Sequence, residues 1–416
     1  MHLFFFISLT FFFLSSCVYM YYLVLFKRNI KVSYLKNKNL INSAEREKKI
    51  NFSENIIFHD YPLADMFVSI VVCARNEEKN MRELLESLCK QEYSLDQFEA
   101  IIVNDGSTDN TSEILKEYAD KYNFIKYFDV TNRSEVKSPK KNAISQAITI
   151  AKGEIILLTD ADCKPTSNWI QSHVSMYKEY PSADMVVGLS KTNLYAYTKP
   201  SICQQFEYID FLVLMFAAQS AIQSGCPMSC SGQNLSYKKN SFNEVGGFMG
   251  IDHYISGDDV LLLQKFVKNK KTIKFASFSN AFTITNPINS WLEFFNQRSR
   301  WISNSKAMFS MNLTFFFYLL ASFFCLGLMP FLFIFLYIIL ILFSISFITK
   351  AMNLYTASSI SNSSSKQCYQ SNNHDSLLRK GEINFIKILK WSIINPFYII
   401  IATFLGICSI FVWKRD

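Results

Sequence analysis

The ten cysteines of this chain lack the spacing that marks a metal site or a disulfide framework. None forms a CxxC pair, and His253 has no second His or Cys at the separation that zinc ligands keep along a sequence. We therefore expect free, reduced thiols and interpret His253 as a structural residue.

A stripe of basic residues interleaved with aromatics is also missing, although the formal net charge is +8. Such a stripe is typical of nucleic-acid-binding proteins, so we expect no nucleic-acid partner. Much of the positive excess lies in Lys27–Lys49, directly after an apolar run. In that position it is typical of the cytoplasmic flank of a membrane span.

Charged residues are absent from Leu3–Phe26, which is long enough to cross a bilayer. The segment Leu14-Ser15-Ser16-Cys17 resembles a lipoprotein cleavage site, so a signal peptide is the alternative. However, no basic residue precedes the apolar run, and the run continues beyond Cys17. We expect a transmembrane anchor over residues 1–26 and a basic juxtamembrane linker over residues 27–65, with the following domain in the cytoplasm.

Apolar runs return near the carboxyl end. Residues 313–348 exceed one span of about 20 residues, so we expect a transmembrane hairpin that turns at Met329-Pro330. Residues 349–392 predict a polar loop, and residues 393–413 predict a final span whose orientation stays open, because basic residues flank both of its ends. The spans are few and carry no charge, which disfavours a transporter or channel.

The middle of the chain alternates between strand and helix patterns. Apolar runs at Phe67–Val72, Ala100–Val103 and Ile155–Leu158 predict buried strands, and helices are expected between them, including Thr111–Tyr118 and Ala143–Ala151. This alternation predicts an α/β domain over residues 66–285, with a doubly wound, mostly parallel sheet and its loops gathered at one edge.

Carboxylates follow two of these strands. Asp160 and Asp162 come directly after the most apolar strand and point the same way, because alternate residues of an extended chain share a face. Asp105 follows the strand before it. Ligands bind open α/β sheets at this edge, and two carboxylates suit Mg²⁺ or Mn²⁺ together with a diphosphate. The alternative is that these acids are solvated residues of turns and helix caps.

Several segments of the chain resemble, in order, a family 2 glycosyltransferase of the GT-A fold. They are VVCARNEEKN, VNDGSTDNT and LLTDADC; Ser231-Gly232-Gln233-Asn234, similar to the acceptor-side segment; and Gly257-Asp258-Asp259, similar to the acid–base segment. In residues 286–312, an expected interfacial segment, Gln297-Arg298-Ser299-Arg300-Trp301 matches the Q-x-x-R-W motif of the membrane-embedded synthases of cellulose, chitin, hyaluronan and poly-N-acetylglucosamine. The resemblance covers roughly Val68–Trp301.

The resemblance implies a role for each matching residue. Nucleotide-sugar contacts fall on Ala74, Arg75, Glu77, Asp105, Lys140, Lys141, Asp160, Gln297, Arg298, Arg300 and Trp301; metal ligation on Asp160 and Asp162; and acceptor contacts on Gln233, Asn234 and Trp301. Many members carry Thr-Glu-Asp where this chain has Gly257-Asp258-Asp259. We expect Asp259 to be the general base and keep Asp258 as its alternate.

The function implied is that of a membrane-bound inverting enzyme that moves a sugar from a nucleotide donor, UDP-linked, to a glycan or lipid-linked acceptor at the cytoplasmic face. Polymer synthesis and a single transfer both stay open, as do the sugar and the oligomeric state. A catalytically inactive scaffold is the alternative, although all the expected acids are present.

Individual residues also have simpler interpretations. Asp258 and Asp259 suit a helix amino terminus. Arg298, Arg300 and Trp301 suit an interfacial anchor before a membrane span.

Overall fold

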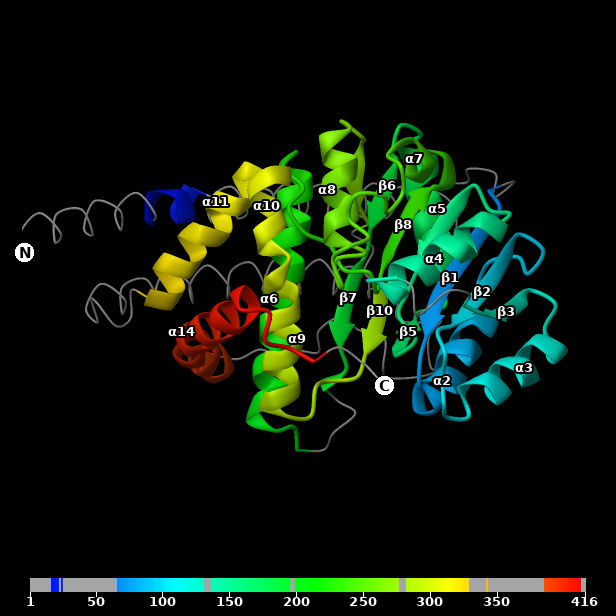
Figure 1. The fold of residues 1–416 in the computed structure, drawn as a ribbon, viewed down its shortest axis with the longest axis horizontal. Helices are drawn as coiled ribbons and strands as arrows, with labels where there is room; N and C mark the ends of the chain where they lie inside the picture. Colours follow the sequence, from blue (N-terminus) through cyan, green and yellow to red (C-terminus); the bar gives the residue numbers. More distant parts are fainter. Residues whose placement is uncertain are drawn as a thin grey trace, which may run out of the picture. The chain divides into compact units, whose positions relative to one another are not determined.

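The computed structural model describes residues 16–21, 24, 66–130, 136–194, 199–276, 282–328, 342 and 385–412 (Figure 1). The chain divides into two compact units whose segments alternate along the sequence. The α/β unit comprises Tyr61–Thr198 and Cys226–Pro287, and the helical unit comprises Met1–Asp60, Lys199–Gly225 and Ile288–Asp416. The segment Lys199–Gly225, which lies inside the domain expected at residues 66–285, therefore groups with the helical unit.

A seven-stranded sheet forms the centre of the α/β unit, in the order β3-β2-β1-β4-β8-β6-β9. Its strands are β1 (Val68–Ala74), β2 (Phe98–Asn104), β3 (Ile125–Asp129), β4 (Ile155–Leu158), β6 (Met185–Val187), β8 (Leu235–Lys238) and β9 (Ile273–Phe275). Only β8 runs antiparallel to its neighbours, β4 and β6. The predicted mixed α/β, mostly parallel sheet is therefore confirmed.

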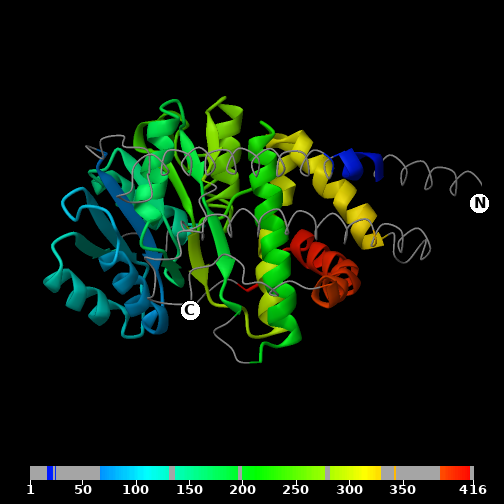
Figure 2. The same ribbon diagram turned by 180° about the vertical axis from the view of Figure 1, so that it is seen from behind.

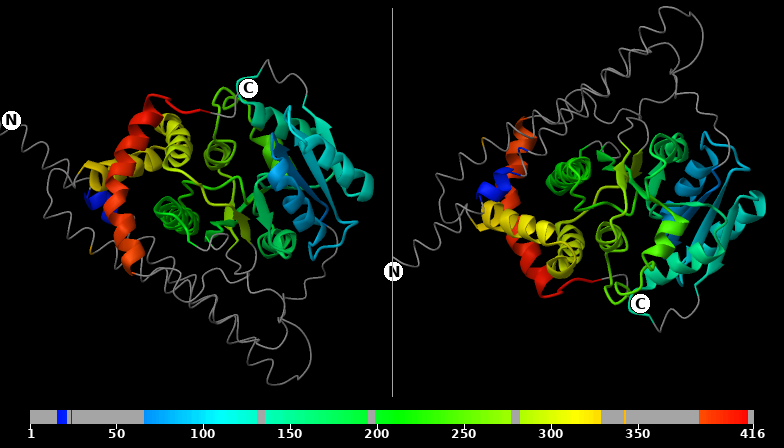
Figure 3. Two further views of the ribbon diagram at one scale, coloured as in Figure 1. Left: turned by 90° about the horizontal axis from the view of Figure 1, so that it is seen from below. Right: turned by 90° about the horizontal axis from the view of Figure 1, so that it is seen from above.

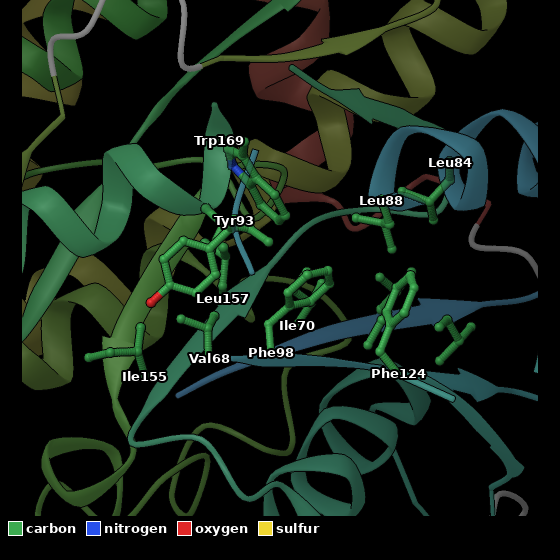
Figure 4. Close-up of a cluster of buried hydrophobic side chains, with 14 of the residues drawn as sticks. Val68, Ile70, Leu84, Leu88, Tyr93, Phe98, Phe124, Ile155, Leu157 and Trp169 are labelled. Carbon is green, nitrogen blue, oxygen red and sulfur yellow. The ribbon is translucent and has the colours of Figure 1, made fainter. Parts of the chain in front are cut away.

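Helices cover both faces of this sheet. The helices of the α/β unit are α2 (Glu78–Cys89), α3 (Thr111–Lys121), α4 (Pro139–Ile150), α5 (Trp169–Glu179), α7 (Lys239–Glu244) and α8 (Val260–Lys268). Buried side chains of α2, α3 and α5 join one cluster with alternate residues of β1, such as Ile70 (Figure 4). Helix α4 packs against β1 and β2 but shares no residue with that cluster, which places it on the opposite face.

A smaller sheet has the order β5-β10-β7. Its strands are β5 (Cys163–Pro165), β7 (Leu189–Thr192) and β10 (Phe282–Thr285). Strand β5 begins directly after Asp162, so the chain enters this sheet immediately beyond the two carboxylates that follow β4.

The helical unit contains α6 (Ile202–Gln223), α9 (Trp291–Ser303), α10 (Ser305–Met311), α11 (Leu313–Ser322), the π-helical turn η3 (Phe323–Leu328) and α14 (Phe385–Ile407). Helix α14 packs along α9, α6 and η3 (Figures 2 and 3). The rings of Phe206, Trp291, Phe294, Trp391 and Tyr398 form an aromatic cluster among α6, α9 and α14.

Among the described residues, one helix, Ile386–Ile407, is long and apolar enough to cross a membrane. It begins earlier than the span expected over residues 393–413. A shorter apolar helix, Leu313–Gly327, covers the start of the expected hairpin over residues 313–348. Most of the anchor over residues 1–26, the linker over residues 27–65, the rest of the hairpin apart from Leu342 and most of the loop over residues 349–392 lie outside the described residues.

Gly153, just before β4, has no space for a side chain. A Cβ there would lie 2.4 Å from the backbone nitrogen of Ser69, and the Gly153 N–H already donates to the Ser69 hydroxyl at 2.8 Å. The same hydroxyl donates to the buried carboxylate of Glu99 at 2.7 Å. The Glu99 carboxylate also forms an ion pair with Lys126 at 2.6 Å. The glycine thus lets β4 lie close to β1 over a fully hydrogen-bonded carboxylate.

We expect Gly153→Ala to lower the free energy of unfolding by about 1–3 kcal/mol, because the added methyl group overpacks this contact. Thermal unfolding of the purified full chain measures the effect, with the exposed neighbour substitution Lys152→Ala as the control. Equal unfolding midpoints for the two variants would contradict the close approach of β4 to β1.

Candidate active site

The carboxyl ends of three parallel strands meet at one edge of the large sheet. Ala74 of β1 is in register with Asn104 of β2, and Val71 of β1 with Leu158 of β4. The segments that follow these strands begin with Arg75, Asp105 and Thr159, so this register brings the predicted loops together. This edge is where open α/β sheets bind ligands.

The loops after β1 and β2 hydrogen-bond to each other. The Asn76 N–H donates to the Ser107 hydroxyl at 3.0 Å, and the Thr108 N–H donates to the Asn76 side-chain oxygen at 2.8 Å. Asp109 accepts from the backbone N–H groups of Glu78 (3.1 Å) and Thr111 (3.0 Å), so it serves the starts of both α2 and α3. Asp109 is thus a structural turn residue.

Asp105 differs from Asp109 in being buried, with 5% of its surface exposed. It lies within electrostatic reach of Cys73 at the end of β1, together with Lys140, Asp258 and Asp160. Burial, then Asp105, acts to raise the pKa of the Cys73 thiol, which therefore stays protonated. Four of the predicted site residues, Asp105, Lys140, Asp160 and Asp258, therefore act electrostatically on this thiol.

Lys140 joins the two acidic segments. Its Nζ lies 2.8 Å from Asp160 Oδ1 and 2.8 Å from Asp258 Oδ2. Burial opposes the charge on the lysine, but the two carboxylates outweigh it and hold the pKa of the Lys140 ammonium well above its usual value. A permanent cation therefore sits between the acid that follows β4 and the acid that precedes α8.

Lys141, the next residue of α4, points elsewhere. It is 2% exposed and donates to the backbone carbonyls of Tyr254 at 2.6 Å and Ser256 at 2.7 Å. Burial lowers the pKa of its ammonium group to about 8, against the opposite effect of Asp258 and Asp259. Lys141 therefore fixes the loop that leads to Gly257 through backbone carbonyls.

Asp259 is the N-cap residue of α8. Its Oδ1 accepts from the Val260 N–H at 2.6 Å, and its Oδ2 accepts from the Gly232 N–H at 2.9 Å. Burial, then the neighbouring charge of Asp258, raises the pKa of Asp259. Burial alone would also raise the pKa of Asp258, but Lys140 holds it below its ordinary value. Of the two acids, Asp259 is the better proton acceptor.

The two predicted acceptor residues occupy different environments. Gln233 is partly exposed, whereas Asn234 is fully buried at the start of β8 with its amide bonded to Trp169, His173 and Leu189. The sequence prediction did not include Trp169 or His173. Their spacing of four residues places them on one face of α5, which is the only sequence signal they carry.

The Q-x-x-R-W segment lies on α9 in the helical unit. Arg298 is 1% exposed, donates from Nε to Asp210 of α6 at 3.0 Å and stacks on the rings of Phe294 and Trp301, at 4.7 and 4.2 Å from their centroids. Gln297 accepts a hydrogen bond from Arg298. The guanidinium of Arg298 is thus committed to fixing α6 against α9, while Arg300 and Trp301 are partly exposed.

Asp160 and Asp162 offer oxygen donors that fit Mg²⁺ or Mn²⁺. The described residues contain no group of three or more His, Cys, Asp or Glu placed to hold a metal ion. A pair of carboxylates is nevertheless a usual magnesium site when a diphosphate supplies further oxygens. The donor set therefore fits a cation that arrives with a phosphorylated ligand.

The chain is similar to known glycosyltransferases in sequence and in structure. Residues 69–255 match the family described as Glycosyl transferase family 2. The chain is 26% identical over 235 residues to the "Probable glycosyltransferase YdaM" of Bacillus subtilis, which covers 56% of this chain and 54% of that protein. It is 28% identical over 180 residues to the "Poly-beta-1,6-N-acetyl-D-glucosamine synthase" of Staphylococcus epidermidis, covering 43% and 41% of the two chains. The chain thus matches about half the length of these relatives, or less.

One similar structure is the mannosyltransferase PcManGT from Pyrobaculum calidifontis in complex with GDP-Man and Mn²⁺. The TM-score is 0.53 with 14% sequence identity, and the alignment covers 97% of this chain and 100% of that one. At this level of identity the likeness shows the GT-A fold alone.

Proposed function

We propose that this chain, whose residues 69–255 match the glycosyl transferase family 2 model, is a membrane-bound inverting glycosyltransferase. The proposed donor is a UDP-linked sugar, and the proposed acceptor is a glycan or a lipid-linked molecule at the cytoplasmic face. The observation that carries the proposal is Lys140, which bridges the acid after β4 and the acid before α8. Through Lys140, the proposed donor site at Asp160 lies close to the segment that contains the proposed proton acceptor, Asp259.

On the donor side, Asp160 and Asp162 would hold Mg²⁺ or Mn²⁺ together with the diphosphate. The bound cation would supply positive charge as the leaving group departs. Lys140 adds a fixed positive charge next to Asp160. We assign Asp105, which follows β2, to a hydrogen bond from the uracil ring. We assign Ala74, which ends β1, and Arg75 and Glu77, which follow it, to the loop over the nucleoside at the same edge.

On the acceptor side, we assign proton removal to Asp259. The attacking hydroxyl is a poor nucleophile until its proton is removed, and a carboxylate with a raised pKa accepts that proton more readily. Attack from the face opposite the leaving group inverts the anomeric carbon. We assign sugar and diphosphate contacts to Gln297, Arg300 and Trp301 from their motif alone. Lys141 instead fixes the loop before Gly257, and Arg298 fixes α6 against α9 within the helical unit.

A panel of nucleotide sugars tests the proposal. Purified membranes that contain the chain are incubated with each labelled donor, and the product is extracted and sized. Transfer from one UDP-sugar supports the proposal, and product length separates a polymer from a single addition to a lipid. Intact, donor-binding protein with no transfer from any sugar would favour an inactive scaffold.

We further propose that the domain faces the cytoplasm. The basic cluster within residues 27–65 supports this side of the membrane, and the apolar helix Ile386–Ile407 supports the membrane location itself. Protease added to intact cells is therefore expected not to cleave within residues 66–286 until the membrane is permeabilised. Cleavage in unbroken cells, or a mature protein that begins at Cys17, would contradict it.

A further inference from the structure

Several buried polar groups surround the side chain of Asn234, which directly precedes β8. The amide oxygen of Asn234 accepts from Trp169 Nε1 at 2.8 Å and lies 2.7 Å from His173 Nε2. The amide nitrogen donates to the Leu189 carbonyl at 2.6 Å. Asn234 has no exposed surface, and Trp169 and His173 are also buried.

These partners fix both the orientation of the amide and the tautomer of the histidine. A carbonyl only accepts, so the amide nitrogen must face Leu189 and the oxygen must face α5. His173 therefore carries its proton on Nε2, and its Nδ1 accepts from the Ser236 hydroxyl at 2.7 Å. Burial lowers the pKa of His173 to about 4, so the ring stays neutral.

The backbone around Asn234 is equally confined. The Gly188 N–H donates to the Asn234 carbonyl at 2.8 Å, and a Cβ on Gly188 would lie 2.2 Å from the Asn234 amide oxygen. Leaving a buried amide unpaired is energetically costly, so this side chain has one stable position. Asn234 is thus held from α5, β7 and Gly188 together.

The turn that ends at Asn234 contacts the acid–base segment. The Asn234 N–H donates to the Ser231 carbonyl at 3.2 Å, which closes the turn, and the Gly232 N–H within it donates to Asp259 Oδ2 at 2.9 Å. A Cβ on Gly232 would lie 3.4 Å from Asp258 Oδ2 and 3.6 Å from the Asp259 Cβ. The position of this turn therefore sets the direction from which Asp259 is hydrogen-bonded.

We propose that Asn234 is a positioning residue, which contacts no acceptor and instead holds the turn 231–234 so that the Gly232 N–H meets the carboxylate of Asp259. The inference rests on the proposed function, because that function assigns to Asp259 the removal of a proton from the acceptor. Trp169 and His173 act through Asn234, so these two residues of α5 help to orient Asp259.

Substitutions on α5 test the inference without altering any residue assigned to the reaction. His173→Asn keeps an atom near Nδ1 but loses the donor to Asn234, whereas His173→Gln keeps a donor near Nε2. Trp169→Phe removes the other donor. Tyr177→Phe is the matched control, because Tyr177 lies on the same helix and its buried hydroxyl bonds to Ser236 Oγ of β8 at 3.0 Å rather than to Asn234.

We expect His173→Asn and Trp169→Phe to lower kcat by up to about 10²-fold, because small displacements of a catalytic group are costly, with the Kd for UDP unchanged. His173→Gln and Tyr177→Phe should keep kcat within a few-fold of the parent at a similar loss of thermal stability. Equal kcat across all four variants, or parallel losses of kcat and UDP binding, would overturn the inference. A parent chain that binds no UDP and transfers no sugar would instead refute the proposed function.

Discussion

Asp259→Asn is expected to lower the rate of sugar transfer by about 10²–10⁴-fold while donor binding stays near normal. The amide cannot accept the proton of the attacking hydroxyl. The base meets the acceptor and not the nucleotide, so the Kd for the UDP-sugar should change little. Single-turnover transfer and equilibrium binding of UDP, measured on the same preparation, separate the two quantities.

The pH dependence of transfer belongs to the same prediction. Asp259 acts only when deprotonated, and burial and Asp258 raise its pKa. The rate of sugar transfer should therefore fall on acidification. The fall should begin at a higher pH than it would if the base were a carboxylate with an ordinary pKa. An acid limb no higher than that of an unperturbed Asp would contradict the assignment of this residue.

Asp258→Asn is the matched comparison. Asp258 pairs with Lys140 at 2.8 Å, so its loss should weaken transfer measurably without abolishing it. If Asp258→Asn is inactive and Asp259→Asn is active, the roles of the two acids are reversed. If both variants transfer normally, this segment is only the start of α8.

Asp162→Asn is expected to abolish turnover and to weaken UDP binding in the presence of Mn²⁺. A metal ligand serves the donor itself, so its loss should affect both binding and the chemical step, unlike the loss of a base. Calorimetry of UDP with and without Mn²⁺ measures the effect apart from activity. We expect the dependence of UDP affinity on Mn²⁺ to disappear.

Asp129→Asn is the control for this substitution, because Asp129 is an exposed carboxylate at the end of β3 at the same sheet edge. It should retain both turnover and the effect of Mn²⁺. Undiminished, metal-dependent activity of Asp162→Asn would refute the assignment of the metal site.

Strongly patterned features were predictable from the sequence. The apolar runs of β1, β2 and β4 stand out because parallel strands are buried on both faces, and each is followed by the residues of the proposed site. Strand β3 was not predicted, because most of its residues are partly exposed, and β6 and β9 are only three residues long.

The sequence did not predict which of two neighbouring residues contacts the acidic side chains and which supports the structure. Lys140 and Lys141 follow each other on α4, where consecutive side chains point in different directions, so only the fold tells which lysine meets the acids. Arg298 and Asn234 both lie in recognised motifs. In the structure, however, the guanidinium of Arg298 pairs with Asp210, and the side-chain amide of Asn234 bonds to α5. Such pairings join residues far apart in the sequence and have no local signal.

The stereochemistry of the product tests the central claim most directly. Transfer from an α-linked UDP-sugar should give a β-linked product with one UDP released per bond formed, which NMR of the anomeric proton and phosphate analysis can measure. Intact UDP-binding protein that forms an α-linked product, or releases UDP without forming any glycosidic bond, would contradict a mechanism in which Asp259 activates an acceptor opposite the diphosphate.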